Sequence, residues 1–330
     1  MAVLEKFLRE GKLIKASELP DVQMLPLGNI SMDYVLGGGL CKGLIYLVSG
    51  PPSSGKSSFA VATAQAVMNA GGKALVVDLE HAWLKPRLAS WGLSSSDNLY
   101  IAQDIPNLES AYSLVVEGIN EFDLVIVDSI GAICTIAEEK ATVAERQYAP
   151  GVREVNNMLR KVLPKLKSQD AAALILISQI REVIGGAGGI RPVGGHALLH
   201  DAHVWLETRI NSQLMLERDT PEGRVKEVVG LQLQLHTRKS KICPPFRRAD
   251  VRLIIKPFKS LQPPCFDPYF DAFVWGQVCG LIVKTGSWFT IELDDKKEKF
   301  QGSEGIYGLD LQRLFQLREA IRERVLSCEA

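Results

Sequence analysis

The sequence predicts an α/β fold: a mostly parallel sheet flanked by helices, with an antiparallel extension and a small α+β domain at the C-terminal end. From about residue 24 to residue 257, near-continuous apolar runs alternate with helical patterns, which is typical of parallel strands buried on both faces. Three later segments in this range alternate polar and apolar residues without helices between them, as half-exposed antiparallel strands do. Four prolines then fall within the 14 residues from 257 to 270, and such a segment favours a domain boundary.

Each element can be assigned a range. Parallel strands are predicted at residues 43–50, 73–80, 122–129 and 171–179, and helices at 56–70, 107–120 and 151–167. Antiparallel strands are predicted at 202–210, 229–237 and 249–257. The C-terminal domain is expected to hold helices at 270–283 and 309–325 and a strand at 286–293. An amphipathic helix at 3–10 leads into an extended arm with a turn at Pro20, so the predicted units are 1–23, 24–257 and 258–330.

Composition limits the classes of function. Lys plus Arg and Asp plus Glu both total 38, so the chain lacks a global basic footprint, and any nucleic acid must be contacted by local loops. The six cysteines are scattered, without metal-ligand spacing, which favours free thiols in a reducing compartment. The first residues lack the apolar stretch of a signal peptide, and no segment approaches 18 uncharged apolar residues. We therefore expect a cytoplasmic protein without a membrane partner.

A phosphate-binding loop is predicted at residues 50–58. GPPSSGKSS matches G-x-x-x-x-G-K-[ST] between a predicted strand and a predicted helix. The glycines let backbone N–H groups turn toward a phosphate at the helix N-terminus, Lys56 would reach the terminal phosphates, and Ser57 would ligate magnesium. A chance glycine-rich turn is the alternative. The predicted nucleotide-binding residues are Gly50, Pro51, Ser53, Ser54, Gly55, Lys56, Ser57 and Ser58.

Two further predicted strands end in carboxylates. Asp128 closes FDLVIVDS and is predicted to hold magnesium with Ser57, although an acidic residue at this position could merely cap the following helix. VVDLEHAW offers Asp78 and Glu80, of which Glu80 is the candidate base that orients or deprotonates the attacking water. His81 is interpreted as a packing or hydrogen-bonding residue.

Together these motifs resemble the RecA family of DNA strand-exchange recombinases, in its bacterial or phage branch. GPPSSGKSS, DLEHAW, LVIVDSIGAI and LILISQIR look like the family's phosphate loop, catalytic-glutamate strand, magnesium-aspartate strand and switch-glutamine strand. GGHAL, RKSKICPPFRRA and KTGSWFT continue the likeness from about residue 4 to residue 300 in consistent order. The resemblance implies a RecA-type P-loop ATPase core that uses ATP and Mg²⁺, with a short N-terminal helix and arm that packs on the next subunit.

The resemblance also implies catalytic roles. Glu80 is similar to the catalytic glutamate, and Gln179 to the glutamine that senses the terminal phosphate and signals to a DNA-binding loop. Lys239 and Lys241 match a lysine pair that reaches the ATP of the neighbouring subunit. Without the family pattern, Gln179 would be read as a strand-end amide bonded to local backbone, and RKSK as a solvated basic turn.

Two loops are implied to face DNA. IREVIGGAGGIRPVGGHA has six glycines in 11 positions from 185 to 195, which is typical of a loop ordered by its ligand; a flexible lid over the nucleotide is the alternative. EEKATVAERQYAP, residues 138–150, would form the other loop, with Tyr148 either wedged at a base step or packed within the loop. The implied DNA-binding residues are Arg153, Asn157, Arg160, Arg181, Ile184, Gly194, Gly195 and Tyr148.

The chain departs from the family pattern at three positions. Arg87 stands where bacterial members stack an aromatic ring on adenine, and a guanidinium plane can also stack there. Leu199 replaces a lysine that helps across the subunit interface, and His200 replaces an aromatic interface residue. A long acidic tail is missing, since the chain ends RVLSCEA. These departures favour a phage-encoded or otherwise divergent member.

The predicted function is an ATP-dependent homologous recombinase. It would form helical filaments on single-stranded DNA and exchange that strand into homologous duplex DNA, with mediator and single-strand-binding proteins as further candidate partners. Two rivals belong to other classes. One is a ring-forming motor or helicase with the same core fold, and the other is an ATP-binding mediator or switch that exchanges no strands.

Overall fold

The computed structural model describes residues 7, 13, 15–19, 21–130, 132–140, 150–166, 171–182, 190–221, 223–294 and 296–327. Apart from Phe7, the helix predicted at 3–10 lies outside the described residues. The helices are η1 (Ala16–Glu18), α2 (Ile30–Leu36), α3 (Lys56–Asn69), α4 (Lys85–Ser90), α5 (Leu108–Gly118), α6 (Ile136–Lys140), α7 (Pro150–Lys165), α8 (Gly195–Asp201), α9 (Pro268–Val278), η2 (Ser303–Gly308) and α10 (Leu311–Ser327). The first strands are β1 (Met24–Leu25), β2 (Leu40–Cys41), β3 (Ile45–Gly50), β4 (Ala74–Asp78), β5 (Leu99–Ala102), β6 (Leu124–Asp128), β7 (Ala173–Glu182) and β8 (Ile190–Pro192). The remaining strands are β9 (Val204–Thr220), β10 (Gly223–Ser240), β11 (Arg248–Ile254), β12 (Cys265–Phe266), β13 (Ile282–Thr285), β14 (Trp288–Leu293) and β15 (Lys296–Gln301).

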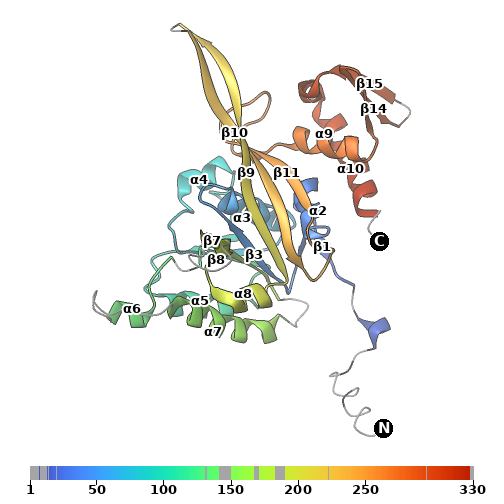
Figure 1. The fold of residues 1–330 in the computed structure, drawn as a ribbon. Coiled ribbons are helices and arrows are strands. Elements are labelled where there is room, and N and C mark those ends of the chain that lie inside the picture. The colour runs from blue at the N-terminus through green and yellow to red at the C-terminus, as the bar shows by residue number, and fades with distance from the viewer. Residues whose placement is uncertain are drawn as a thin grey trace.

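A large mixed sheet is the centre of the molecule (Figure 1). Within the described residues its order is β12-β11-β10-β9-β3-β7-β6-β4-β5, with β8 paired to β7. The strands from β9 to β5 run parallel, whereas β9, β10, β11 and β12 pair antiparallel. The predicted parallel sheet with an antiparallel extension is confirmed, and β9 belongs to both parts.

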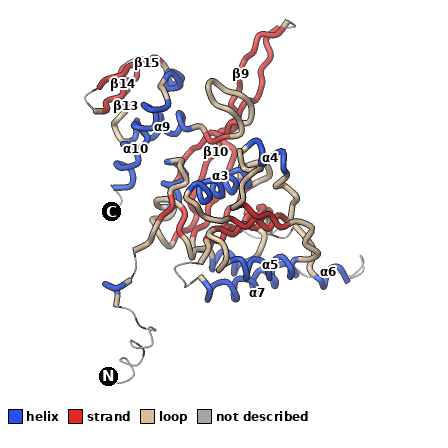
Figure 2. Tube along the Cα trace, turned by 180° about the vertical axis from the view of Figure 1, so that it is seen from behind, coloured by secondary structure: helices blue, strands red, loops and turns tan. Residues whose placement is uncertain are grey.

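Helices cover the parallel part on both faces, with α3 on one side and α5 and α7 on the other (Figure 2). Successive strand side chains point to opposite faces, so Val76 and Ile126 belong to the core that contains Phe59 of α3. Their neighbours Val77 and Val127 belong to the second core, with α5 and α7. This double burial explains why these strands read as continuous apolar runs.

The β9–β10 hairpin is longer than predicted and projects beyond the sheet (Figure 1). The prediction ended the first strand at residue 210 and began the second at 229, but pairing continues to Thr220 opposite Gly223. The segment between is strongly polar, so it carries little hydrophobic signal for a strand. Cross-strand ion pairs join Lys226 to Glu217 at 3.2 Å and Arg218 to Glu227 at 3.0 Å, and they favour this pairing.

One predicted helix is wrong at its end. The apolar pattern indicated a helix over 270–283, but α9 ends at Val278 and β13 begins at Ile282. Gly280 lies between them with φ 71°, a left-handed conformation that glycine adopts readily and that ends helices. Helical and strand patterns are both apolar here, and the glycine is the signal that separates them.

The C-terminal segment is attached to the core through a buried carboxylate. Asp271 of α9 accepts hydrogen bonds from the backbone N–H groups of Ile30 and Ser31 at 2.7 and 3.0 Å, and from the Ser31 hydroxyl at 2.7 Å. It therefore caps the first turn of α2 from the other side of the predicted boundary at 257/258. Burial raises the pKa of Asp271.

Asp271→Ala should destabilise the protein by about 2–3 kcal/mol, because it leaves buried N–H groups of α2 without an acceptor. Thermal unfolding of the variant measures this loss. Glu292→Ala is a matched control, since Glu292 forms an exposed ion pair with Lys297, and such pairs contribute little. Equal unfolding temperatures for the two variants would contradict the capping role.

Candidate functional site

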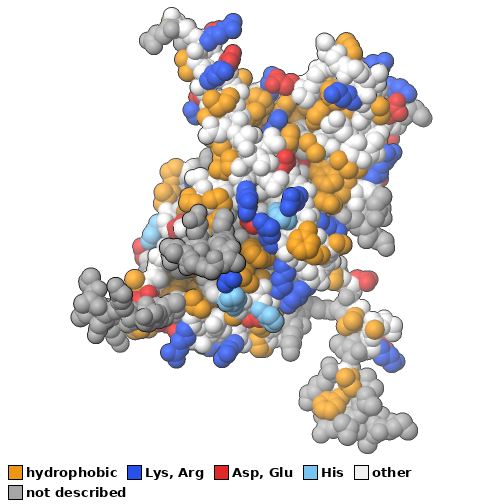
Figure 3. Space-filling model, in the orientation of Figure 1, with side chains coloured by type: hydrophobic (Ala, Val, Ile, Leu, Met, Phe, Trp, Pro, Cys, Tyr) orange, Lys and Arg blue, Asp and Glu red, His pale blue; other side chains and the backbone are white. Residues whose placement is uncertain are grey.

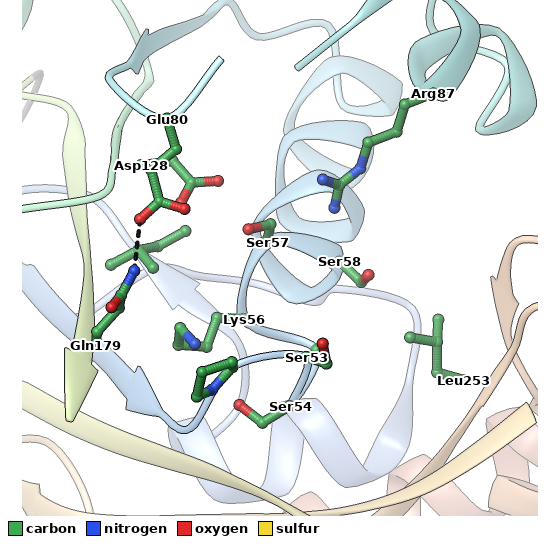
Figure 4. Close-up of a pocket in the computed structure, with 13 residues that line it drawn as sticks. Ser53, Ser54, Lys56, Ser57, Ser58, Glu80, Arg87, Asp128, Gln179 and Leu253 are labelled. Atoms are coloured by element: carbon green, nitrogen blue, oxygen red, sulfur yellow. Dashed lines mark hydrogen bonds between the residues drawn. The ribbon is translucent and has the colours of Figure 1, made fainter. Parts of the chain in front are cut away.

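A cavity of about 290 Å³ opens at the carboxyl ends of β3, β6 and β7 (Figure 4). This is the edge at which open α/β sheets bind ligands. The cavity is lined by Pro52, Ser53, Ser54, Gly55, Lys56, Ser57, Ser58, Glu80, Arg87, Asp128, Ile177, Gln179 and Leu253. The structure thus brings together the predicted phosphate loop, both strand-end carboxylates, the predicted switch glutamine and Arg87.

The phosphate loop runs from the end of β3 into α3. Gly55 has φ 86° and precedes the first residue of α3, while a Cβ on Gly50 would come within 2.4 Å of the Thr208 carbonyl oxygen. Lys56 Nζ donates to the carbonyl oxygens of Gly50 at 3.0 Å and Pro51 at 2.8 Å. Burial lowers the pKa of the Lys56 ammonium, whereas the charges of Glu80 and Asp128 raise it. Gly55 is therefore needed for the turn and Gly50 for the close approach of β9, and the lysine is held within the loop.

Asp128 lies at the end of β6, facing the first turn of α3. Its carboxylate accepts hydrogen bonds from the Ser57 hydroxyl and, at 3.0 Å, from Nε1 of Trp83. Burial raises the pKa of Asp128, while these two hydrogen bonds lower it. Asp78 has a different role, since it accepts from the backbone N–H groups of Ala82 and Trp83, both at 2.9 Å. It therefore holds the loop that carries Glu80.

Glu80 is exposed at the rim of the cavity and touches the switch residue. Its Oε1 accepts hydrogen bonds from Gln179 Nε2 at 3.1 Å and from the Ser129 hydroxyl. The backbone N–H of Glu80 donates to the Asp128 carbonyl oxygen at 3.2 Å. His81 is exposed with φ 51° and does not line the cavity.

Gln179 connects the cavity to the glycine-rich segment. Its carbonyl oxygen accepts from the Val193 N–H at 3.0 Å, and the Ser178 hydroxyl donates to the Val193 carbonyl at 2.9 Å. Val193 directly precedes Gly194 and Gly195, which have φ 118° and 82° at the start of α8. The end of β7 is therefore joined to the residue before the α8 N-cap by one hydrogen bond from Gln179 and one from Ser178.

The predicted trans-acting lysines lie away from this cavity. Neither Lys239 nor Lys241 lines it. Lys239 Nζ donates to the carbonyl oxygens of Leu199 at 2.9 Å and His200 at 2.5 Å, at the end of α8, and Lys241 is exposed. Arg87 points from α4 toward the cavity (Figure 4), with Nη1 donating to the Ala82 carbonyl at 3.3 Å.

The structure describes only some of the predicted DNA-binding residues. Arg153 and Arg160 are exposed on α7, and Asn157 between them donates to Glu154 at 3.3 Å. The backbone of Arg181 belongs to β7. Tyr148 and Ile184 lie outside the described residues.

Sequence reasoning missed several residues of the site. Thr208 of β9 bonds through Oγ1 to Ser54 Oγ at 2.7 Å, Trp83 holds Asp128, and Leu253 of β11 lines the cavity. Trp83 stands in the quoted stretch VVDLEHAW, but neither Thr208 nor Leu253 has any local pattern that marks it. Their positions follow from β9 pairing with β3 and β11 pairing with β10.

The donor set fits magnesium bound together with phosphates. Among the described residues, no three His, Cys, Asp or Glu side chains could hold a metal ion by themselves. Ser57 and Asp128 supply one hydroxyl and one carboxylate, and Mg²⁺ in phosphate sites is held by one or two protein ligands plus phosphate oxygens.

Among the helices that the structure describes, none is long and apolar enough to cross a membrane.

Comparisons with known proteins agree with this geometry. The family model of the RecA N-terminal domain matches residues 1–257. The chain is 31% identical to Protein RecA of Thermus thermophilus over 337 residues, covering 99% of this chain and 92% of the relative. It is 30% identical to Protein RecA of Porphyromonas gingivalis over 294 residues, covering 87% and 81%. The crystal structure of the RadB recombinase has a similar fold, with a TM-score of 0.50 and 20% identity over 70% of this chain and 96% of that one. The chain therefore belongs to the RecA family of recombinases.

Proposed function

We propose that this protein is a DNA-dependent ATPase that forms helical filaments on single-stranded DNA and catalyses homologous pairing and strand exchange. The observation that carries the proposal is the hydrogen bond from Gln179 to Glu80. It joins the candidate water-activating carboxylate to a strand that leads directly to the glycine-rich segment. Family membership supplies the recombinase class.

Each residue of the cavity has a role in this proposal. Lys56 leaves its loop carbonyls and binds the terminal phosphates, while backbone N–H groups of 53–58 surround them. Ser57 and Asp128 would hold Mg²⁺, which supplies charge neutralisation at the phosphate oxygens. Glu80 accepts the proton of the attacking water. Arg87, which lines the cavity, stacks on adenine.

ATP and DNA would be coupled through Gln179. In this structure its amide N–H bonds Glu80, and a terminal phosphate offers a competing acceptor. If the amide turns to the phosphate, Glu80 is released for the water, and the turn formed by Val193 and Gly194 before α8 shifts with the glutamine. Two arrangements that ATP and DNA both bias constitute a coupling between the sites.

DNA contacts come from two segments. Arg153 and Arg160 are seven positions apart and exposed on α7, so they share a helix face and can both contact phosphates. By resemblance, Arg181 and the backbone N–H groups of Gly194 and Gly195 bind the phosphates of the same strand, while Ile184 and Tyr148 are wedged at base steps. Such contacts read no sequence.

Lys239 and Lys241 are proposed to complete the nucleotide site of the adjoining subunit. Their position outside their own cavity supports this role. A head-to-tail contact of this kind need not close, and it generates a filament. Hydrolysis would then depend on assembly.

Arg160→Ala should weaken binding to single-stranded DNA. It should also reduce the number of counterions released on binding, given by the slope of log affinity against log salt concentration, by about one. Fluorescence anisotropy at several salt concentrations measures both quantities. Lys161→Ala is the matched control, because Lys161 is also exposed on α7 but lies about 100° around the helix. Equal effects of the two variants would indicate general electrostatics rather than contact by the Arg153–Arg160 face.

Electron microscopy with single-stranded DNA and a non-hydrolysable ATP analogue tests the proposed function. We expect helical filaments, together with DNA-stimulated ATP turnover and strand exchange between homologous molecules. Closed rings that unwind forked duplexes without homology would establish the motor instead. ATP binding with neither assembly nor strand exchange would establish the mediator.

A further inference from the structure

The antiparallel sheet extension carries a cluster of cations on its open face. We call the basic face the set Arg209, Arg238, Lys239, Lys241 and Arg248. Lys and Arg side chains gather over this part of the molecule in Figure 3, and none of the five lines the nucleotide cavity of its own chain. The basic face therefore lies outside the nucleotide cavity of its own subunit.

A bulge in β10 places two of these cations side by side. Thr237 pairs with Leu206 of β9, and Lys239 pairs with Trp205. Arg238 is therefore an extra residue that has no paired residue on β9. Such a bulge re-aims a side chain. Lys239 and Arg238 both reach the face that carries Glu207, where Arg238 bonds the carboxylate of Glu207 and Lys239 bonds the end of α8.

Glu207 holds Arg238 in a defined orientation. The Glu207 side chain is 7% exposed, and its two oxygens accept from Nε of Arg209 and, at 2.5 Å, from Nε of Arg238. Burial raises the pKa of Glu207, but the hydrogen bonds and charges of Arg238 and Arg209 together lower it by more, so the net shift is downward and the group stays ionised. Arg238 bonds Glu207 through Nε, and among the described residues no hydrogen bond from its terminal nitrogens is found, so their N–H groups can donate to an anion.

The surroundings of the pair are positively charged overall. His236 lies opposite Glu207 on β9 and Arg248 on β11. Burial lowers its pKa, and Arg238 and Arg248 lower it further. Within the described residues its buried Nε2 has no hydrogen-bond partner. One carboxylate thus faces two clamped arginines, with further cations beside them, and this arrangement suits an anion with several charges.

We propose that Arg238, held by Glu207, contacts the terminal phosphates of the nucleotide bound by the adjoining subunit, next to Lys239 and Lys241. This role rests on the proposed function, since it requires head-to-tail assembly. Arg238 would neutralise the charge that develops as the bond between the γ-phosphorus and the bridging oxygen breaks and that oxygen takes the electron pair, as trans-acting arginines do. Glu207 is a positioning residue that does not itself reach the phosphate.

Lys239 and Arg238 differ in how readily they can bind a phosphate. Lys239 must leave the carbonyl oxygens of Leu199 and His200 before it can bind a phosphate, and burial lowers its pKa. Arg238 is always charged and already oriented. The arginine therefore provides a fixed contact across the interface, and the lysine provides one that changes partner.

A mixing experiment tests the proposal. Arg238→Gln alone and Glu80→Gln alone should each lower DNA-stimulated ATP turnover by at least about tenfold. In an equal mixture, one interface in about four combines an intact Glu80 with an intact Arg238 from its neighbour, so turnover should rise to about a quarter of the wild-type rate. Arg248→Gln is the control, because it removes the same charge from the basic face without touching Glu207.

The outcomes separate the possibilities. No recovery in the mixture, full activity of Arg238→Gln, or equal losses with Arg248→Gln would each overturn the trans role of Arg238. Reduced DNA affinity with normal turnover at saturating DNA would assign Arg238 to DNA instead. Glu207→Gln should lower turnover at saturating ATP with unchanged ATP affinity, measured at a temperature at which the variant is fully folded, which a merely structural role would not give. A wild-type chain that neither assembles nor hydrolyses ATP would refute the proposed function itself.

Discussion

Lys56→Ala should abolish ATP hydrolysis, with a loss in turnover of at least about 100–1,000-fold. The lysine is buried and lines the cavity, and in the proposed function its ammonium leaves the Gly50 carbonyl oxygen and binds a terminal phosphate. Alanine removes that charge from a partly buried site, where electrostatic interactions are stronger than in bulk water. Steady-state phosphate release in the presence of single-stranded DNA measures the effect.

The stability of the Lys56→Ala protein must be separated from its activity. Lys56 Nζ also holds the carbonyl oxygens of Gly50 and Pro51, so the unfolding temperature of the variant must be measured beside its activity. Lys85→Ala removes an exposed lysine near the cavity that does not line it, and this variant should remain active. Turnover by a folded Lys56→Ala protein would mean that the nucleotide binds elsewhere.

Glu80→Gln should bind ATP and DNA normally but turn over about 100–10,000-fold more slowly, the range over which general bases contribute. Glutamine has the size of glutamate and can still accept from Ser129 and Gln179 through its carbonyl oxygen. It cannot accept the proton of the attacking water. The protein should therefore remain in its ATP-bound, DNA-bound state, and dissociation from labelled DNA after ATP is added measures the persistence of that state.

Ser129→Ala tests the hydrogen bond to Glu80 separately from the Glu80 carboxylate itself. It removes one hydrogen bond to Glu80 and leaves the carboxylate in place, so we expect a smaller loss than with Glu80→Gln. If Glu80→Gln released DNA as fast as the wild type, or if Ser129→Ala were the more damaging change, Glu80 would not be the base.

The parallel core and most of the cavity could be predicted from the sequence because their signals are local. A buried parallel strand is an unbroken apolar run, and three such runs here end at residues of the predicted site: Gly50, Asp128 and Gln179. The run of β4 ends at Asp78, two positions before Glu80. The loop at 50–58 is contiguous, so the short-range pattern already contains its turn and its lysine. Parallel strands bring their carboxyl ends to one edge, which places these side chains together.

Local patterns were insufficient where pairing depends on distant residues. The part of the β9–β10 hairpin beyond the predicted strands is mostly polar, and cross-strand ion pairs stabilise its pairing, while Leu214 and Leu216 pack against the core. The bulge at Arg238 is defined only by the register against β9. For the same reason the role of Asp78 in holding the loop that carries Glu80 was not predicted, because its backbone partners are known only from the structure.

The sequence by itself determined the family, the α/β core and the chemical identity of the phosphate site, since contiguous motifs carry all three. Only the tertiary structure decided which side chains support that site and what lies outside it. Thr208 reaches Ser54 across 154 positions and Asp271 reaches Ile30 across 241. Glu207 similarly clamps Arg238 across 31 positions. A hydrogen bond depends on distance in space and not on separation along the chain, so no window of residues contains these contacts.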